Sequence, residues 1–336
     1  MRVPSRRYLI NPLRRVITLA ATATLFLAAG HRAWPASLPT GASAIIPVWP
    51  RLDVPADERH TPLKNSVAYG RITIGPIRWP ELTVFEPTKP TARAHGAIVI
   101  CPGGGYTGEA MSLEGFRPAR WFARRGFTCF VLRYRLPLKK LPPHGVVWPL
   151  ADVREAVRLV RSKAEKWHVN PADIGVMGFS AGGSVAALAG VHWQPGNPSA
   201  ASPTKRASSR PDFMILVYPV ITMMRPYDLP GCTRQLLGPH AGLDLRRYYS
   251  AEQNVSAGTP PAYIAFAKSD KIVPHENERS FYAALRRNGV PGMLDEFKHG
   301  RHAFGLGRPG TDSVLWPHRC MVWLRQHGFA PPSAGR

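Results

Sequence analysis

Residues 178–183 read Gly178-Phe179-Ser180-Ala181-Gly182-Gly183, and this stretch decides the fold. It follows the apolar run Ile174–Met177 and precedes the small-residue run Ser184–Ala189. A strand, a Gly-x-Ser-x-Gly turn and a helix form a nucleophile elbow, whose strained turn lifts the serine hydroxyl to the top of the sheet and to a helix N-terminus. Serine is a poor nucleophile at neutral pH, so a base and an orienting acid must lie elsewhere in the chain. The alternative is a glycine-rich turn whose serine only caps the helix.

Apolar strand patterns alternate with helical patterns on both sides of this motif. The predicted strands are Ala97–Cys101, Phe127–Tyr134, Phe213–Tyr218, Tyr263–Ala267 and Gly292–Phe297, and the predicted helices are Leu113–Arg125, Leu150–Trp167, Glu276–Arg287 and Val314–Gln326. This alternation predicts an α/β fold with a mainly parallel, doubly wound sheet and helices on both faces. The segment Ile221–Pro261 has no such pattern and predicts a small irregular cap between late strands.

The length of 336 residues suits one large α/β domain better than two. We predict an export signal at residues 1–30, an irregular Pro-rich segment at 31–66 and an α/β-hydrolase domain at 67–330. The signal prediction rests on a basic region followed by the apolar run Val16–Ala29 and then small residues. That run is short for a membrane span, so we expect no stable membrane insertion once the signal is cleaved, while an uncleaved anchor stays open.

The first residues also suggest an export route. Ser5-Arg6-Arg7-Tyr8-Leu9-Ile10 resembles a twin-arginine signal, and the arginine pair equally fits ordinary basic-region charge. Either route predicts a periplasmic or secreted protein. The four cysteines have no metal-ligand spacing, and their pairing stays open.

The chain is strongly basic, with a formal net charge of +23. Residues 1–30 contain five arginines and no acid, so removing them leaves 39 basic and 21 acidic groups, a net charge of +18. Such a field favours anionic neighbours, among them acidic polysaccharide, membrane surface and nucleic acid. The densest cluster, Lys205–Arg210, lies in a Ser/Pro-rich loop without a nucleic-acid-binding signature, so we interpret it as solvated surface and expect no nucleic-acid partner.

The acid and the base should follow late strands. Asp270 comes directly after the strand Tyr263–Ala267, where it can hold an imidazole in one tautomer, although a turn-forming aspartate is the alternative. Two histidines follow the next strand, and we favour His302 over His299 because it lies further into the loop. No carboxylate at ligand spacing accompanies the histidine pair, so we predict no metal. The order Ser180, Asp270, His302 is that of α/β hydrolases.

A glycine run after the first long strand supplies candidate donors for an oxyanion. Gly103, Gly104 and Gly105 can point amides at the site without obstruction by a Cβ, and Ala181 supplies the amide after the nucleophile. A glycine-rich loop can also cradle phosphate, but no Lys-Ser/Thr pair follows here, so a P-loop is excluded.

Several motifs in order resemble one known group. They are Ile98-Val99-Ile100-Cys101-Pro102-Gly103-Gly104-Gly105-Tyr106, Glu114-Gly115, Phe130–Leu136, Gly178–Gly183, Asp270 with Val273-Pro274, and His302–Leu306. Over residues 66–328 the chain resembles the acetylxylan-esterase-like α/β hydrolases, also labelled xylanase-like or feruloyl-esterase-like. Two departures stand out. The oxyanion loop begins Cys101-Pro102 instead of the His-Gly of hormone-sensitive-lipase-like esterases, and Arg301-His302-Ala303 replaces the Gly-His-Gly more usual in the family.

The resemblance implies a serine hydrolase for carboxylic esters, typically acetyl groups on plant polysaccharide, with no metal or other cofactor. The expected partner is an acetylated polysaccharide, an oligosaccharide or another small ester, and Tyr106 is a candidate substrate contact. A serine exopeptidase or a lipase-like esterase on the same fold is the first alternative, because fold does not decide function. A non-catalytic, basic wall-binding protein is the second.

Overall fold

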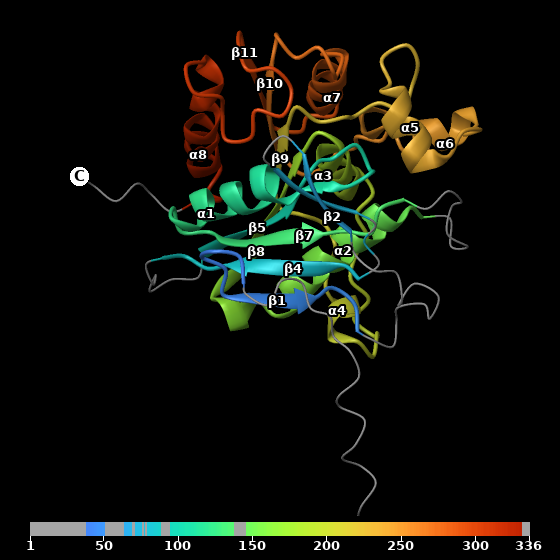
Figure 1. Ribbon diagram of the computed structural model, residues 1–336. Coiled ribbons are helices and arrows are strands. Elements are labelled where there is room, and N and C mark those ends of the chain that lie inside the picture. The colour runs from blue at the N-terminus through green and yellow to red at the C-terminus, as the bar shows by residue number, and fades with distance from the viewer. Residues whose placement is uncertain are drawn as a thin grey trace, which may run out of the picture. The chain divides into compact units, whose positions relative to one another are not determined.

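The main sheet has eight strands in the order β1-β4-β7-β5-β8-β9-β10-β11 (Figure 1). This computed structural model describes residues 38–50, 64–68, 71–75, 77, 79–88, 95–137 and 146–330. The strands are β1 (Ala44–Pro47), β4 (Glu81–Phe85), β7 (Thr128–Arg133), β5 (His95–Cys101), β8 (Val169–Phe179), β9 (Met214–Val217), β10 (Ala262–Ala267) and β11 (Gly292–Phe297). From β7 to β11 all neighbours pair in parallel, and only the β1–β4 and β4–β7 pairs are antiparallel. The prediction of a mainly parallel sheet is confirmed.

The middle strands explain why the sheet is buried on both faces. The residues at 97–101 in β5 and the apolar ones at 174–179 in β8 are fully inaccessible to solvent. Near-continuous apolar runs of this kind are typical of parallel strands covered by helices on each side. Among the described residues, no helix is long and apolar enough to cross a membrane.

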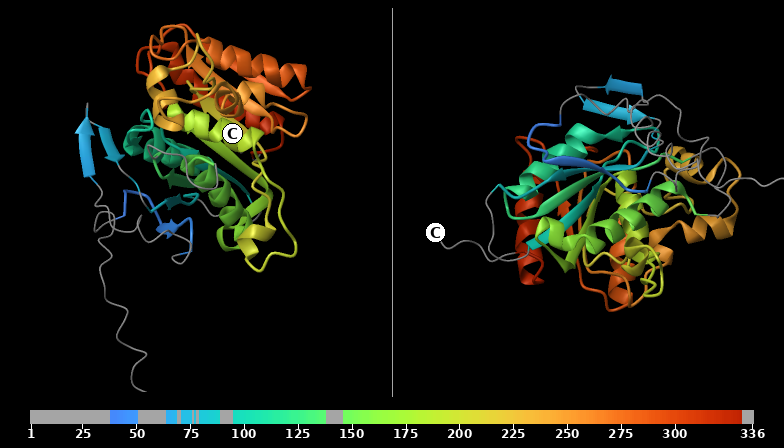
Figure 2. Two further views of the ribbon diagram at one scale, coloured as in Figure 1. Left: turned by 90° about the vertical axis from the view of Figure 1, so that its right-hand side faces the viewer. Right: turned by 90° about the horizontal axis from the view of Figure 1, so that it is seen from below.

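Helices cover both faces of the sheet (Figure 2). They include α1 (Arg117–Ala123), α2 (Trp148–Ser162), α3 (Ala181–Val191), α7 (Glu276–Arg287) and α8 (Trp316–Gln326). Short turns of helix lie at η4 (Ala164–Trp167), α4 (Pro203–Arg206) and η6 (Asp312–Leu315). Helices α1 and α8 adjoin through Phe122 and Trp316, whose ring centroids are 6.4 Å apart. Helix α3 packs on β8 and β9, directly behind the elbow.

The N-terminal part differs from the expectation of an irregular segment at 31–66. Residues 44–47 form β1, which pairs with β4 at the sheet edge. The β-branched pair Ile45 and Ile46 favours a strand, and Pro47 is tolerated because an edge strand has one unpaired side. A small antiparallel sheet contains β2 (Lys64–Ala68), β3 (Arg71–Gly75) and β6 (Glu109–Ala110). The predicted export signal lies outside the described residues.

Two further elements depart from the sequence patterns. The cap between β9 and β10 lies where it was predicted but is not irregular, since it forms α5 (Pro230–Leu237), α6 (Leu243–Tyr248) and η5 (Ala251–Gln253). Figure 1 shows α5 and α6 next to α7. The helix predicted at Leu113–Arg125 starts as the π-helix η3 (Met111–Phe116), which continues into α1. Single π-helical turns are frequent at functional sites.

The fold brings four strand ends together. Strands β5, β8, β10 and β11 are parallel, so Cys101, Phe179, Ala267 and Phe297 end on the same edge of the sheet. The glycine loop, the elbow serine and the predicted acid and base each follow one of these ends. Crevices at the carboxyl edge of an open parallel sheet are the usual place for a ligand.

Candidate active site

The elbow is a strained turn. Ser180 has φ 51° and ψ −122°, a conformation that few non-glycine residues adopt, and it is followed at once by α3. A Cβ on Gly178 would lie 2.1 Å from the carbonyl oxygen of Gly182, and one on Gly182 would lie 2.1 Å from that of Cys101. Only glycine fits at either position. These two glycines, on either side of Ser180, therefore let the turn close tightly enough to present Ser180 at the sheet edge.

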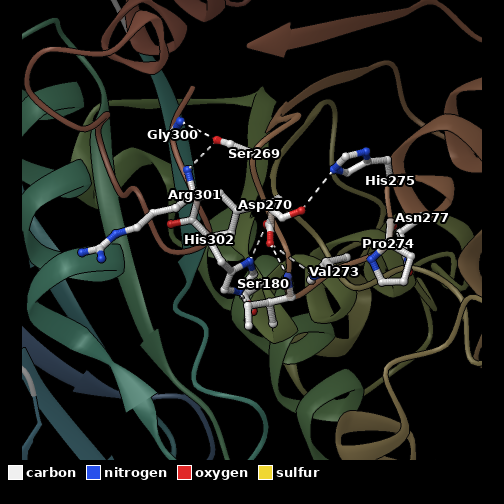
Figure 3. A network of polar contacts seen from close by, with 12 residues as sticks. Ser180, Ser269, Asp270, Val273, Pro274, His275, Asn277, Gly300, Arg301 and His302 are labelled. Carbon is white, nitrogen blue, oxygen red and sulfur yellow. Dashed lines mark hydrogen bonds and ion pairs between the residues drawn. The ribbon is translucent and has the colours of Figure 1, made fainter. Parts of the chain in front are cut away.

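The structure brings the serine, the histidine and the aspartate into one hydrogen-bonded row (Figure 3). Ser180 Oγ lies 2.9 Å from Nε2 of His302, and Nδ1 of His302 lies 2.7 Å from Oδ2 of Asp270. The serine is 8% exposed and the aspartate 7% exposed. A row in this order lets the imidazole take a proton from the hydroxyl while the carboxylate fixes the tautomer.

Asp270 is held in place by its own loop. Its Oδ1 accepts hydrogen bonds from the amides of Ile272 at 2.8 Å and Val273 at 3.3 Å, which leaves Oδ2 for the imidazole. Ser269 fixes the opposite loop, because its Oγ accepts hydrogen bonds from the amides of Gly300 and Arg301. Figure 3 shows both sets of contacts. The acid loop is thus hydrogen-bonded to the histidine loop at Gly300, Arg301 and His302.

The other histidine does not join this row. His299 is exposed and lies 3.9 Å from Asp312, whose carboxylate accepts the amide hydrogen bonds of Lys298 and His299. No group of three or more potential metal ligands occurs among the described residues.

The glycine loop needs one correction. The amide of Gly103, a predicted oxyanion donor, donates instead to Oε2 of Glu114 at 2.9 Å. No described residue accepts a hydrogen bond from Gly104 or Gly105, so these two remain candidates beside Ala181 at the start of α3. Gly103 still lies close to Ser180, since a Cβ there would lie 2.9 Å from Cβ of Ser180. The hydrogen bond from Gly103 to Glu114 ties the glycine loop to η3.

Two buried side chains under the site were given no role by the sequence patterns. Tyr218, at the end of β9, donates from its hydroxyl to Oε1 of Glu114 at 3.0 Å and accepts the amide of Gly305 at 3.0 Å. Its ring also meets the ring of His302 edge-on, with centroids 5.0 Å apart. Glu114 therefore connects the oxyanion loop through Gly103 to the histidine loop through Tyr218. Glu114 belonged to a family motif, which was the one available signal.

Other candidate groups are buried and uncharged. Tyr106 is 2% exposed, and burial raises the pKa of its hydroxyl, so the predicted substrate contact finds no support in its placement. Burial, together with the nearby carboxyl of Glu109, holds the pKa of the Cys101 thiol well above its usual range, which excludes a thiolate nucleophile there. All four cysteines are free and buried.

The chain matches a known family over most of its length. A family model described as BD-FAE matches residues 82–285. An acetylxylan esterase from Xylanibacter ruminicola is 36% identical over 232 residues, which cover 68% of this chain and 44% of that protein. Endo-1,4-beta-xylanase B from Butyrivibrio fibrisolvens is 37% identical over 209 residues, which cover 61% and 32%. The chain thus spans less than half the length of these two curated relatives.

A solved structure agrees with the sequence matches. The crystal structure of an acetyl ester-xyloside bifunctional hydrolase from Caldicellulosiruptor lactoaceticus superposes with a TM-score of 0.75 and 33% identity, covering 88% of this chain and 99% of that one. The chain therefore belongs to the BD-FAE family and is an acetylxylan-esterase-like α/β hydrolase.

Proposed function

We propose that this protein hydrolyses carboxylic esters through an acyl-enzyme, and that its substrates are acetyl esters on xylan or a related carbohydrate. The proposal is carried by the hydrogen-bonded row of Ser180, His302 and Asp270 at the carboxyl edge of the sheet. The relatives named as acetylxylan esterase and acetyl ester-xyloside hydrolase support the choice of substrate.

In the first half-reaction, Oγ of Ser180 attacks the ester carbonyl while Nε2 of His302 takes its proton. The tetrahedral oxyanion accepts hydrogen bonds from the amides of Gly104, Gly105 and Ala181. Removing one such donor typically costs about 3 kcal/mol of transition-state stabilisation. The imidazolium then gives its proton to the leaving alcohol oxygen as the C–O bond breaks, which leaves the acetyl group on Ser180.

In the second half-reaction, water attacks the acetyl carbonyl and His302 takes one of its protons. The oxyanion collapses, the bond to Oγ breaks, and the histidine returns the proton to Ser180. Asp270 stays ionised throughout and stabilises the imidazolium. Acetate and a free hydroxyl on the carbohydrate are the products.

The test measures acetate release from p-nitrophenyl acetate and from acetylated xylan. We expect the protein to hydrolyse both and Ser180→Ala to lose at least about a thousandfold in kcat while keeping its circular dichroism spectrum. Equal rates for the two proteins would remove catalysis from this serine. Butyrate and octanoate esters rank the acyl length, and a preference for octanoate would favour a lipase-like esterase instead.

We further propose that the protein acts outside the cytoplasm. The basic region and apolar run at residues 1–30 support export, as does a polymeric substrate that cells meet outside their membrane. Fractionation of cells that express the full chain tests this, and recovery in the cytoplasm alone would contradict it.

A further inference from the structure

The residues on either side of His302 adopt conformations that favour glycine. Arg301 has φ 51° and Ala303 has φ 57°. A non-glycine residue in this region costs on the order of 1 kcal/mol. A side chain that is kept at a strained position beside a reactive group points to a use for that side chain.

A pocket of about 330 Å³ lies against this strained turn, and we call it the arginine pocket. It lies between the histidine loop and the start of α1, and it contains three cationic and three large apolar residues. These are Arg117, Arg301, Arg308, Leu113, Phe304 and Leu306. Figure 3 shows the side chain of Arg301 extending from the histidine loop away from Asp270. The pocket therefore begins one residue from the catalytic imidazole.

Within the described part of the chain, the three arginines have no charge partner. All are exposed, and none forms an ion pair or a side-chain hydrogen bond with a described residue. No acidic residue is among those that line the pocket. The positive field extends along α1, where burial first and then the charges of Arg117 and Arg124 lower the pKa of Arg120.

The wall of the pocket is held in advance of any ligand. Gly305 follows two of the lining residues, and its amide donates to the hydroxyl of Tyr218 while its carbonyl accepts from Nε1 of Trp316 at 2.9 Å. Tyr218 and Trp316 are fully buried. Because the amide and the carbonyl of Gly305 are both held by buried side chains, the loop backbone is fixed there, and a ligand entering the pocket orders mainly the arginine side chains.

We propose that the arginine pocket binds a carboxylate on the saccharide part of the ester substrate, so that the protein prefers acetylated sugars with an acidic neighbour such as a uronic acid. Guanidinium groups match carboxylates with paired hydrogen bonds. The apolar wall of Leu113, Phe304 and Leu306 suits the C–H face of a sugar ring better than it suits a free inorganic ion. This inference rests on the proposed ester hydrolysis, because it assigns the pocket to the same substrate.

The first test measures binding without catalysis. Glucuronate, glucose and inorganic phosphate are titrated into the unmodified protein by NMR or calorimetry, and each is a non-ester that the protein does not consume. We expect glucuronate alone to bind, and the double variant R117Q/R308Q to weaken its affinity by roughly tenfold or more. The matched control is Arg287→Gln, which removes an exposed arginine from the end of α7 and leaves the affinity unchanged. Equal binding of glucose or of phosphate would overturn the assignment.

The second test measures specificity. The ratio of kcat/KM for an acetylated methyl glucuronide to that for the same acetylated methyl glucoside is compared between the protein and R117Q/R308Q. We expect the ratio to exceed one, to fall at least about tenfold in the double variant, and to fall with added salt. A ratio of one, or a ratio that survives the substitutions, would refute the pocket while leaving ester hydrolysis intact. A failure of the proposed ester hydrolysis gives a different result, because Ser180→Ala would then retain full activity on the neutral ester.

Discussion

Removing the hydroxyl of Tyr218 tests whether this group positions the candidate catalytic residues or only stabilises the fold. Replacement by Phe removes one oxygen and keeps the ring that meets His302 edge-on. The lost oxygen donates to the Glu114 carboxylate and accepts the amide of Gly305, both at 3.0 Å. Tyr218→Phe therefore takes one contact from the residue that anchors the oxyanion loop and another from the loop that carries the base.

The magnitude follows from the two contacts. A hydrogen bond to a charged group contributes about 1.5–3 kcal/mol and a neutral one about 0.5–1.5 kcal/mol. Both lie in a fully buried site where water cannot replace the hydroxyl. We expect Tyr218→Phe to lower the free energy of unfolding by about 2–4 kcal/mol. Because a shift of about 1 Å in a catalytic group can cost about a hundredfold in rate, we also expect kcat to fall between about tenfold and a hundredfold, with KM changing less.

The assay pairs urea unfolding with kinetics on p-nitrophenyl acetate, and Tyr263→Phe is the matched control. Tyr263 is also fully buried, and its hydroxyl lies 2.5 Å from Oδ2 of Asp295 and 3.2 Å from the carbonyl oxygen of Trp316, without contacting Ser180, His302 or Asp270. It should lose comparable stability and keep kcat. If both variants lose the same stability and both keep full kcat, the hydroxyl of Tyr218 has only a structural role and the reasoning is refuted.

Three further substitutions test other parts of the site. Asp270→Asn should lower kcat by as much as about 10⁴-fold with an unchanged circular dichroism spectrum, because an amide no longer fixes the tautomer of the imidazole. Gly104→Ala places a Cβ 2.2 Å from the Gly108 carbonyl oxygen. Because this displaces a candidate oxyanion amide, kcat should fall by about 10²–10³-fold. The control Gly289→Ala also has a positive φ but has open space around the new Cβ, so it should leave kcat unchanged. For Glu109, burial raises the carboxyl pKa well above 4.5, so the stability of the folded state should fall as the pH rises above that value. Urea unfolding at a series of pH values should show Glu109→Gln losing this decline, and an identical slope in both proteins would contradict it.

The sequence predicts those features that depend on local pattern. The apolar runs of β5 and β8 and the glycines around Ser180 each specify their own conformation, so the sheet and the elbow could be read residue by residue. Asp270 and His302 were placed by a rule of chain order, since loops after parallel strands meet at one edge. The short edge strand β1 and the helices of the cap were missed, because each depends on packing against a neighbour more than on its own pattern.

The buried polar network could not be predicted in the same way. Tyr218 and Glu114 are separated by 104 residues, and nothing near either one indicates a partner. The hydrogen bond from the Gly103 amide to Glu114 could not be predicted for the same reason. It determines which amides of the glycine loop remain free to bind an oxyanion. A buried carboxylate is tolerated only where donors surround it. The partners of such a group are therefore set by the topology.

Backbone strain shows how the fold and the site depend on each other. Among the described residues, six non-glycine positions have positive φ, and five of them are Tyr106, Ser180, Tyr218, Arg301 and Ala303. These belong to the oxyanion loop, the elbow, the end of β9 and the histidine loop, so the strain gathers at one edge of the sheet. At about 1 kcal/mol or more each, such conformations persist only if the surroundings over-determine them. The hydrogen bonds of Glu114 and Tyr218 join three of these segments: the oxyanion loop through Gly103, the end of β9, and the histidine loop through Gly305. The elbow is attached to the end of β9, because the amide of Ser180 donates to the carbonyl of Val217. The same contacts that offset the strain thus hold Ser180, His302 and the candidate oxyanion amides in register, which is why we expect the loss of a single buried hydroxyl to affect kcat as well as stability.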